Sequence, residues 1–429
     1  MVGRKIVHFL FLLLMGLSLA SCTRDGCQLN LSLGPCNQET TRKVLLLYEA
    51  GFNSISGDIR NNIITLKKGY LPGKGKNEDV LLVMSHLTES YAAYNQEISP
   101  VLIRMYQNNN GNPVMDTLYT WPKGTAMAHK EIVTEVFNLV RERFPAASYG
   151  AVMSSHSTGW LPEGYFSSPH DRGSGSELFW SSSMRRTFGQ EYYKAENKSQ
   201  TEEIEIYDLA AAIPYHLDYL IFDSCLMGTV EVAWELRNVC DLLAVSPCEI
   251  PGAGMVYSTL AEHLLKPEVP DVQGVCTDYF AEYEHNSTYG ATITLVDCRK
   301  LDPLAEVCKE LFEEYRSEIR NLDGRNVQVY DRMVGKKNYL AFFDLKDLLR
   351  EAGASEAELS ALQEALDKAI QYEAHTARFI DVLLSRCCGL AMYLPAYPDY
   401  RIDTWHGTTY LDNFYKEHLA WNAATSLVD

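Results

Sequence analysis

The chain has 429 residues, and 46% of them are hydrophobic, which is enough to build the core of one large domain or of two smaller ones. Its 56 acidic and 38 basic residues give a formal net charge of -18 at pH 7. Because so acidic a chain offers little to neutralise phosphates, we expect no nucleic-acid partner. An acidic surface is compatible with cationic substrates.

The N-terminus has the pattern of an export signal. Arg4 and Lys5 precede the apolar stretch IVHFLFLLLMGLSLA, which is short for a membrane span. The stretch ends in LASC, which resembles the lipobox of bacterial lipoproteins and makes Cys22 the acylated residue. We predict a signal peptide over residues 1–21 and a lipid-anchored protein of the bacterial cell envelope, on its periplasmic face or at the cell surface. An ordinary secretory signal with a chance cysteine is the alternative.

After a polar tether at residues 22–40, short apolar runs alternate with segments of helical period. The runs with a strand pattern are KVLLLYEA, EDVLLVMSHL, PVLIRMYQ, YGAVMSSH, LDYLIFDSC and CDLLAVSPCE. This alternation is typical of an α/β protein with a mostly parallel sheet covered on both faces. We predict this core over residues 41–285 and a helix-rich C-terminal subdomain, packed on the sheet, over residues 286–429.

The cysteines do not form a recognisable framework. An exported protein with eleven cysteines could form disulfides. However, Cys240, Cys276, Cys298 and Cys308 stand inside apolar segments, where cysteine often serves as a small core residue. We predict no required disulfide and, from the spacing, no metal site.

Two predicted strands end in side chains that can carry nucleophilic chemistry. One ends in Cys225 and the other in His156. Ligands of open α/β sheets bind beyond the carboxyl ends of the strands. A right-handed crossover through a helix predicted near residues 202–213 would place both ends at one edge. A thiol beside an imidazole is the pair that a cysteine nucleophile requires.

The neighbours of this pair are suited to an oxyanion. Gly159 follows His156 closely and would let the backbone approach a substrate carbonyl. We expect the amide of Cys225 to lie near the start of the next helix, where unpaired N–H groups favour negative charge and lower a thiol pKa. The backbone N–H groups of Gly159 and Cys225 are therefore the candidates for an oxyanion hole.

Asp223 lies two residues before Cys225, so on a strand the two side chains point to the same side. Spacing alone leaves three roles open. The carboxylate could orient His156, line a pocket for a substrate side chain, or cap a helix predicted to begin near Met227.

The segments SSHSTGW and FDSCLMGTVEVAWEL closely resemble the His and Cys boxes of the clostripain family of cysteine peptidases, in the caspase-like clan. Three further segments resemble that family in the same order: VLLLYEAGFNS, SPCEIPGAGMVYSTL and GLAMYLP. The resemblance covers residues 41–420. It implies a caspase-like α/β/α sandwich, a peptide or protein substrate, and a catalytic dyad of His156 and Cys225.

The same resemblance bears on specificity for P1, the residue before the cleaved bond. The family's acidic residue in the S1 pocket falls on Asp223, which implies cleavage after Arg or Lys. Several Arg-cleaving relatives carry a second acidic residue before the tyrosine of the segment after the catalytic helix, where this chain has Val256. No cofactor is required by the dyad chemistry. A calcium requirement is left open because the family's namesake depends on calcium, although this sequence has no EF-hand-like loop.

A long polar stretch, from about residue 161 to residue 200, separates the His and Cys strands. It is far longer than one connection in a compact domain requires. Because relatives are cleaved during activation, the basic residues in it are candidates for self-cleavage, namely Arg185, Arg186, Lys194 and Lys198.

The sequence lacks the usual motifs of serine, zinc and nucleotide chemistry, since it contains no G-x-S-x-G, H-E-x-x-H or Walker A motif. The remaining alternative to a peptidase is a catalytically silent surface lipoprotein that keeps the fold as a binding module. The intact Cys225, His156 and Gly159 favour the peptidase.

Overall fold

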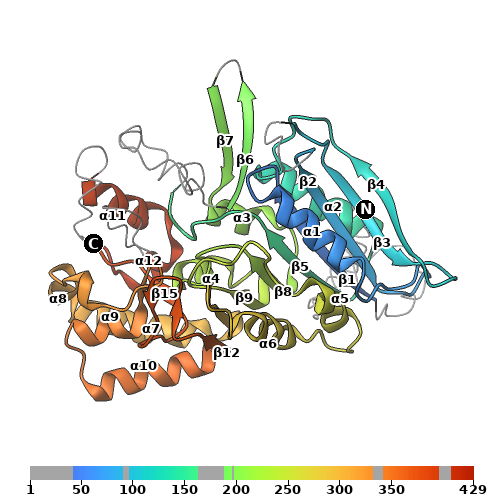
Figure 1. The fold of residues 1–429 in the computed structure, drawn as a ribbon. Helices are drawn as coiled ribbons and strands as arrows, with labels where there is room; N and C mark the ends of the chain where they lie inside the picture. Colours follow the sequence, from blue (N-terminus) through green and yellow to red (C-terminus); the bar gives the residue numbers. More distant parts are fainter. Residues whose placement is uncertain (1–41, 90–95, 163–187, 196–197, 332–341, 396–406) are drawn as a thin grey trace, which may run out of the picture.

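The computed structural model describes residues 42–89, 96–162, 188–195, 198–331, 342–395 and 407–429. A nine-stranded sheet runs through the centre, and helices cover both of its faces (Figure 1). This arrangement confirms the predicted α/β/α sandwich with a mostly parallel sheet.

The sheet has the strand order β12-β10-β9-β8-β5-β1-β2-β3-β4. Its five central strands, from β9 to β2, pair in parallel, whereas the outer strands pair antiparallel. The bounds are β1 (Lys43–Gly51), β2 (Val80–Leu87), β3 (Val101–Gln107), β4 (Pro113–Thr120), β5 (Ser148–Ser154), β8 (Leu217–Asp223), β9 (Cys240–Val245), β10 (Thr292–Asp297) and β12 (Ile370–His375).

Burial explains which strands the sequence reveals. Every residue of β1 and β2 is buried, so each strand contains an uninterrupted apolar run, residues 44–48 in β1 and residues 80–84 in β2. The edge strand β4 is largely exposed and begins with Pro113, so it has no apolar run and the sequence did not predict it.

Two sets of helices enclose the sheet. One face is covered by α1 (Ser56–Leu66), α5 (Tyr257–Leu265) and α6 (Val272–Tyr283), which share a buried cluster with Leu45 and Leu47. The other face is covered by α2 (Lys130–Arg143), α3 (Ile206–Ala212) and α4 (Val230–Leu236).

The C-terminal part extends the second face with further helices. Its strands β10 and β12 belong to the central sheet although they follow the predicted domain boundary at residue 285, so the sheet continues across that boundary. The remaining elements are α7 (Leu301–Glu314), α8 (Arg316–Arg320), β11 (Phe343–Asp344), α9 (Leu345–Glu351), α10 (Glu356–Ala369), β13 (Arg378–Phe379), β14 (Val382–Leu383), β15 (Ala391–Met392), α11 (Gly407–His418) and α12 (Ala420–Thr425).

A hairpin stands inside the stretch that the sequence predicted as a polar connection. Strands β6 (Phe188–Ala195) and β7 (Lys198–Ile204) pair antiparallel with each other and project from the sheet (Figure 1). The sequence predicted only a long polar connection there, and no strands. The two strands form a separate sheet and carry mostly polar residues, so they lack the apolar run by which buried strands are recognised.

The described cysteines are all free thiols, and Cys240, Cys276, Cys298 and Cys308 are buried in the core as predicted. In the same part of the chain, no helix has the length and apolar character that crossing a membrane requires. The predicted signal peptide, Cys22 and the tether lie outside the described residues.

Candidate active site

The parallel pairing of β5 and β8 brings the two predicted reactive residues to one edge. Ser154 of β5 is the register partner of Asp223 of β8, and both strands end there. His156 and Cys225 therefore leave the sheet side by side, and both line a cavity of about 650 Å³. The juxtaposition predicted from strand ends is present in the structure.

His156 is held from two directions. Its Nε2 lies 2.8 Å from the hydroxyl oxygen of Ser54, which belongs to the loop after β1. Its carbonyl oxygen accepts a hydrogen bond from the backbone N–H of Gly189, 3.1 Å away, where the chain enters β6. The sequence analysis did not identify Ser54, although its place just beyond the carboxyl end of β1 could have suggested it.

Cys225 is partly exposed to the cavity. Its Sγ accepts a hydrogen bond from the backbone N–H of Ile250, at 3.4 Å, in the loop after β9. The hydroxyl of Ser157 donates to the carbonyl oxygen of Cys225, which ties the His segment to the Cys segment. An N–H donor at the sulfur favours a thiolate over a thiol.

The helix after Cys225 begins later than predicted. It starts at Val230 and is capped by Thr229, whose Oγ1 accepts from the N–H of Val232 at 3.1 Å. Before it, the chain is held in a loop because the N–H of Gly228 donates to the carbonyl of Ser246. The expected placement of the Cys225 amide at a helix start was therefore wrong, and so was a capping role for Asp223.

Gly159 has a conformation and a position that favour glycine. Its φ is +63°. A Cβ at this residue would lie 2.5 Å from the carbonyl oxygen of Leu226 and 3.0 Å from the ring of Phe342. The absent side chain lets the segment after His156 contact the loop that carries Cys225.

Asp223 lines the same cavity and is almost fully buried. Its Oδ2 accepts a hydrogen bond of 2.6 Å from the hydroxyl of Tyr257. Burial raises the pKa of Asp223 to about 6, against the opposite effect of Tyr257 and of the N–H of Met255. A Cβ at Gly254 would lie 2.3 Å from Oδ2, so the facing loop leaves this carboxylate uncovered by a side chain. The geometry favours the pocket-lining role.

The cavity has a strongly acidic wall. Five carboxyl groups line it, and no lysine or arginine is found among its described lining residues; the acidic residues are Asp58, Asp223, Glu249, Glu282 and Asp331. Burial raises the pKa of Asp58, in the first turn of α1. Such a wall attracts cationic groups.

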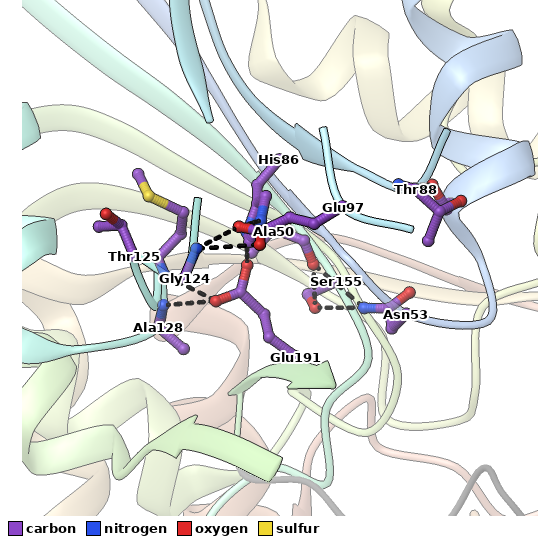
Figure 2. Close-up of polar contacts among 12 residues, drawn as sticks. Ala50, Asn53, His86, Thr88, Glu97, Gly124, Thr125, Ala128, Ser155 and Glu191 are labelled. Atoms are coloured by element: carbon purple, nitrogen blue, oxygen red, sulfur yellow. Dashed lines mark hydrogen bonds and ion pairs between the residues drawn. The ribbon is translucent and has the colours of Figure 1, made fainter. Parts of the chain in front are cut away.

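A buried histidine fixes the entry into the β6 strand (Figure 2). His86 of β2 contacts a carboxyl oxygen of Glu191 through Nδ1 and one of Glu97, at 2.9 Å, through Nε2. The other oxygen of Glu191 accepts from the N–H of Met127 at 2.6 Å. Because Glu191 closely follows Gly189, this network also supports the segment that holds His156. This network could not be predicted from the sequence, since its partners come from distant parts of the chain.

Calcium binding would require a cluster of ligands. In the described part of the chain, no group of three or more His, Cys, Asp or Glu side chains is arranged to hold a metal ion.

The fold and the cavity with its thiol and imidazole define a cysteine-type peptidase of caspase-like architecture. The chain belongs to the clostripain family, whose family model matches residues 47–424. Both the predicted family and the predicted enzyme class are confirmed.

Several solved structures are similar to this chain, among them two C11 proteases. One is an inactive zymogen C11 protease from Parabacteroides distasonis, with 25% identity, a TM-score of 0.70, and coverage of 90% of this chain and 99% of that one. The other is a secreted C11 cysteine protease from Bacteroides thetaiotaomicron in complex with an irreversible peptide inhibitor, with 22% identity, a TM-score of 0.67 and the same coverage. No curated protein matches the chain significantly.

The His86 network predicts a pH dependence of stability. Burial lowers the pKa of His86, but Glu191 and Glu97 outweigh this effect and raise it to about 9. This pKa is above the value of about 6.5 for histidine in an unfolded chain. The stabilisation of the folded state by His86 is therefore complete below about pH 6.5 and is lost as pH rises through about 9. We expect His86→Gln to lower the free energy of unfolding by roughly 2–3 kcal/mol below pH 6.5 and by less at pH 9.

Urea denaturation of both proteins across this pH range measures the difference. The difference between the free energies of unfolding of wild type and variant cancels the contributions of groups that titrate alike in both proteins. A difference that stays constant with pH would show that folding does not raise the pKa of His86, and one that grows as pH rises through about 6.5 would show that the folded imidazole is neutral.

Proposed function

We propose that Cys225 is the nucleophile of this peptidase and that His156 is its general base and acid. The observation that carries the proposal is their shared cavity at the carboxyl ends of β5 and β8. The thiolate attacks the carbonyl carbon of the peptide, and the imidazolium of His156 then protonates the leaving amine. Water, deprotonated by His156, hydrolyses the resulting thioester and regenerates the thiol.

The tetrahedral intermediate requires donors for its oxyanion. We assign this role to the backbone N–H groups of Gly159 and Cys225. The close approach of Gly159 to Leu226, for which a glycine is needed, supports this assignment because it brings the two segments together. The loop conformation around Cys225, not a helix dipole, would then orient its amide.

We assign Asp223 to the S1 pocket and propose cleavage after Arg or Lys. The acidic wall of the cavity supports a cationic substrate side chain, and Asp223 is its buried member nearest in sequence to Cys225. A carboxylate with one oxygen free of hydrogen bonds can accept from a guanidinium or an ammonium.

Self-cleavage in the segment between β5 and β8 is part of the proposal. That a similar structure is an inactive zymogen supports an activation step. Arg185 and Arg186 lie outside the described residues. Lys194 and Lys198 lie on β6 and β7, so cleavage beside them would require the hairpin to open.

We also propose that Cys22 carries a lipid anchor that holds the peptidase at the cell envelope. The support is the sequence pattern before Cys22 and the polar tether that follows it.

Loss of either member of the dyad should abolish hydrolysis. We expect Cys225→Ala and His156→Ala each to reduce kcat/KM by more than about 100-fold without unfolding the protein. Cys308→Ala is the matched control, since that thiol is buried in α7 away from the cavity, and it should remain active. The measurement is hydrolysis of a fluorogenic peptide, with thermal unfolding as the check on folding.

A variant that keeps more than about a hundredth of the wild-type rate would refute the dyad. Inactive wild-type protein, with Cys225 labelled by iodoacetamide no faster than the other cysteines, would favour the silent binding module.

The preference for basic P1 residues should depend on Asp223. A charge-assisted hydrogen bond there is worth roughly 1.5–3 kcal/mol, which corresponds to about a tenfold to hundredfold preference. We expect Asp223→Asn to lose that preference while hydrolysis after neutral residues changes much less. Peptides that differ only in P1, with Arg, Lys, Ala, Leu or Asp, measure it. A wild-type optimum at an apolar or acidic residue would contradict the assignment.

Replacement of Cys22 should release the protein from the membrane. A bacterial lipoprotein carries at least two acyl chains, which is enough for stable anchoring, whereas one chain binds marginally. We expect Cys22→Ala to move from the membrane fraction to the soluble fraction, as followed by cell fractionation. Unchanged membrane association would show that the anchor is not a lipid on Cys22.

A further inference from the structure

Glu49 lies two residues before the end of β1, at a buried position near Asp223 of the proposed S1 pocket. It is the register partner of Ser154, and Ser154 is the partner of Asp223, so the three residues form one row across three parallel strands. Side chains in one row point to the same face of a sheet. Glu49 therefore faces the side that Asp223 faces, under α1, α5 and α6, and its exposure is 0%.

The carboxyl group of Glu49 lacks the hydrogen bonds that a buried structural carboxyl usually has. Neither of its oxygens has a partner with hydrogen-bond geometry, and the same holds for Oδ1 of Asp223. The hydroxyls of Ser154 and Tyr257 are close enough to favour the ionised form of Glu49, but they do not complete a hydrogen bond to it. A buried, incompletely paired carboxyl next to a substrate pocket is a candidate for function, because burial without a partner is destabilising.

Glu49 and Asp223 are coupled through their charges. Burial raises the pKa of Glu49 well above its ordinary value, and the charge of Asp223 raises it further. Burial also raises the pKa of Asp223, to about 6. Because each carboxylate disfavours ionisation of the other, the pair loses its second proton at a higher pH than its first.

The titratable side chains that face this pair from the described helices are three tyrosines and a carboxyl, namely Tyr257 of α5, Tyr279 and Tyr283 of α6, and Asp58 of α1. Burial raises the pKa of each tyrosine, so all three stay neutral near neutral pH. A cationic group of a bound substrate would supply the positive charge that draws the proton from Glu49.

We propose that Glu49 is a second acidic determinant of the preference for basic P1 residues, acting through Asp223 without touching the substrate. The inference rests on the function proposed above. A guanidinium or ammonium that binds Asp223 lowers the affinity of Glu49 for its proton, which leaves to solvent. The pair therefore loses its second proton at a lower pH when a cationic substrate is bound than when the pocket is empty. The second carboxyl comes from β1, whereas the position before Tyr257 is occupied by Val256.

The test compares P1 arginine with P1 citrulline, its neutral analogue, in otherwise identical peptides. The ratio of the two kcat/KM values cancels the titration of Cys225 and His156, which both substrates share. In the wild type we expect this ratio to rise with pH between about pH 6 and pH 9, as the pair loses its proton in the complex. In Glu49→Gln the ratio should be about tenfold lower than in the wild type near pH 9, and it should no longer rise with pH in the upper part of this range.

Glu231→Gln is the matched control. Glu231 is also a buried glutamate, but it lies in α4 on the opposite face of the sheet, where it accepts from the N–H of Tyr393 at 2.9 Å and from the hydroxyl of Tyr415 at 2.7 Å. Its substitution should leave the ratio and its pH profile unchanged, even where it lowers the thermal midpoint.

The outcomes separate this inference from the proposed function. A wild type with no preference for arginine over citrulline would overturn the S1 assignment itself. If arginine is preferred and Asp223→Asn removes the preference, but Glu49→Gln keeps the wild-type ratio and profile, then Glu49 has no part in specificity. If Glu49→Gln does not fold, a wild-type ratio that levels off just above pH 6, where Asp223 alone titrates, refutes the inference, and a ratio that continues to rise toward pH 9 supports it.

Discussion

The parallel register of β1, β5 and β8 is the constraint on which the site depends. Glu49, Ser154 and Asp223 stand side by side in one row, at which β5 and β8 end and beyond which β1 continues only to Gly51. His156 and Cys225 follow that row at the same edge. A shift by one residue would point the acidic side chains to the opposite face and separate the reactive pair.

The loops above that row hold the reactive groups through backbone contacts. The N–H of Ile250 contacts the thiol of Cys225, and the N–H of Gly189 holds the carbonyl of His156. Such contacts depend on the path of the chain more than on side-chain identity. The acidic side chains below them then determine which substrate charge the site accepts, so the chemistry and the specificity have separate structural supports.

This division explains what the sequence could predict. The central strands are continuous apolar runs, and the rule that ligands bind at their carboxyl ends was enough to place His156 with Cys225. The late start of α4 and the contact of Ser54 with His156 depend on loops that meet only after folding. The β6–β7 hairpin and the pairing of Glu191 with His86 were not predicted for a similar reason, because polar strands and distant partners leave no periodic pattern in the sequence.

The order of the strands has a consequence for the covalent continuity of the chain. The segment before β6 contributes β1 to β5, and the segment after it contributes β8, β9, β10 and β12, yet β5 and β8 are neighbours in the middle of one sheet. A backbone break between β5 and β6 would therefore leave two fragments joined by a full parallel ladder, by the contact of Glu191 with His86, and by a shared core. The fragments would migrate as a single particle under native conditions and part only when the sheet itself is unfolded.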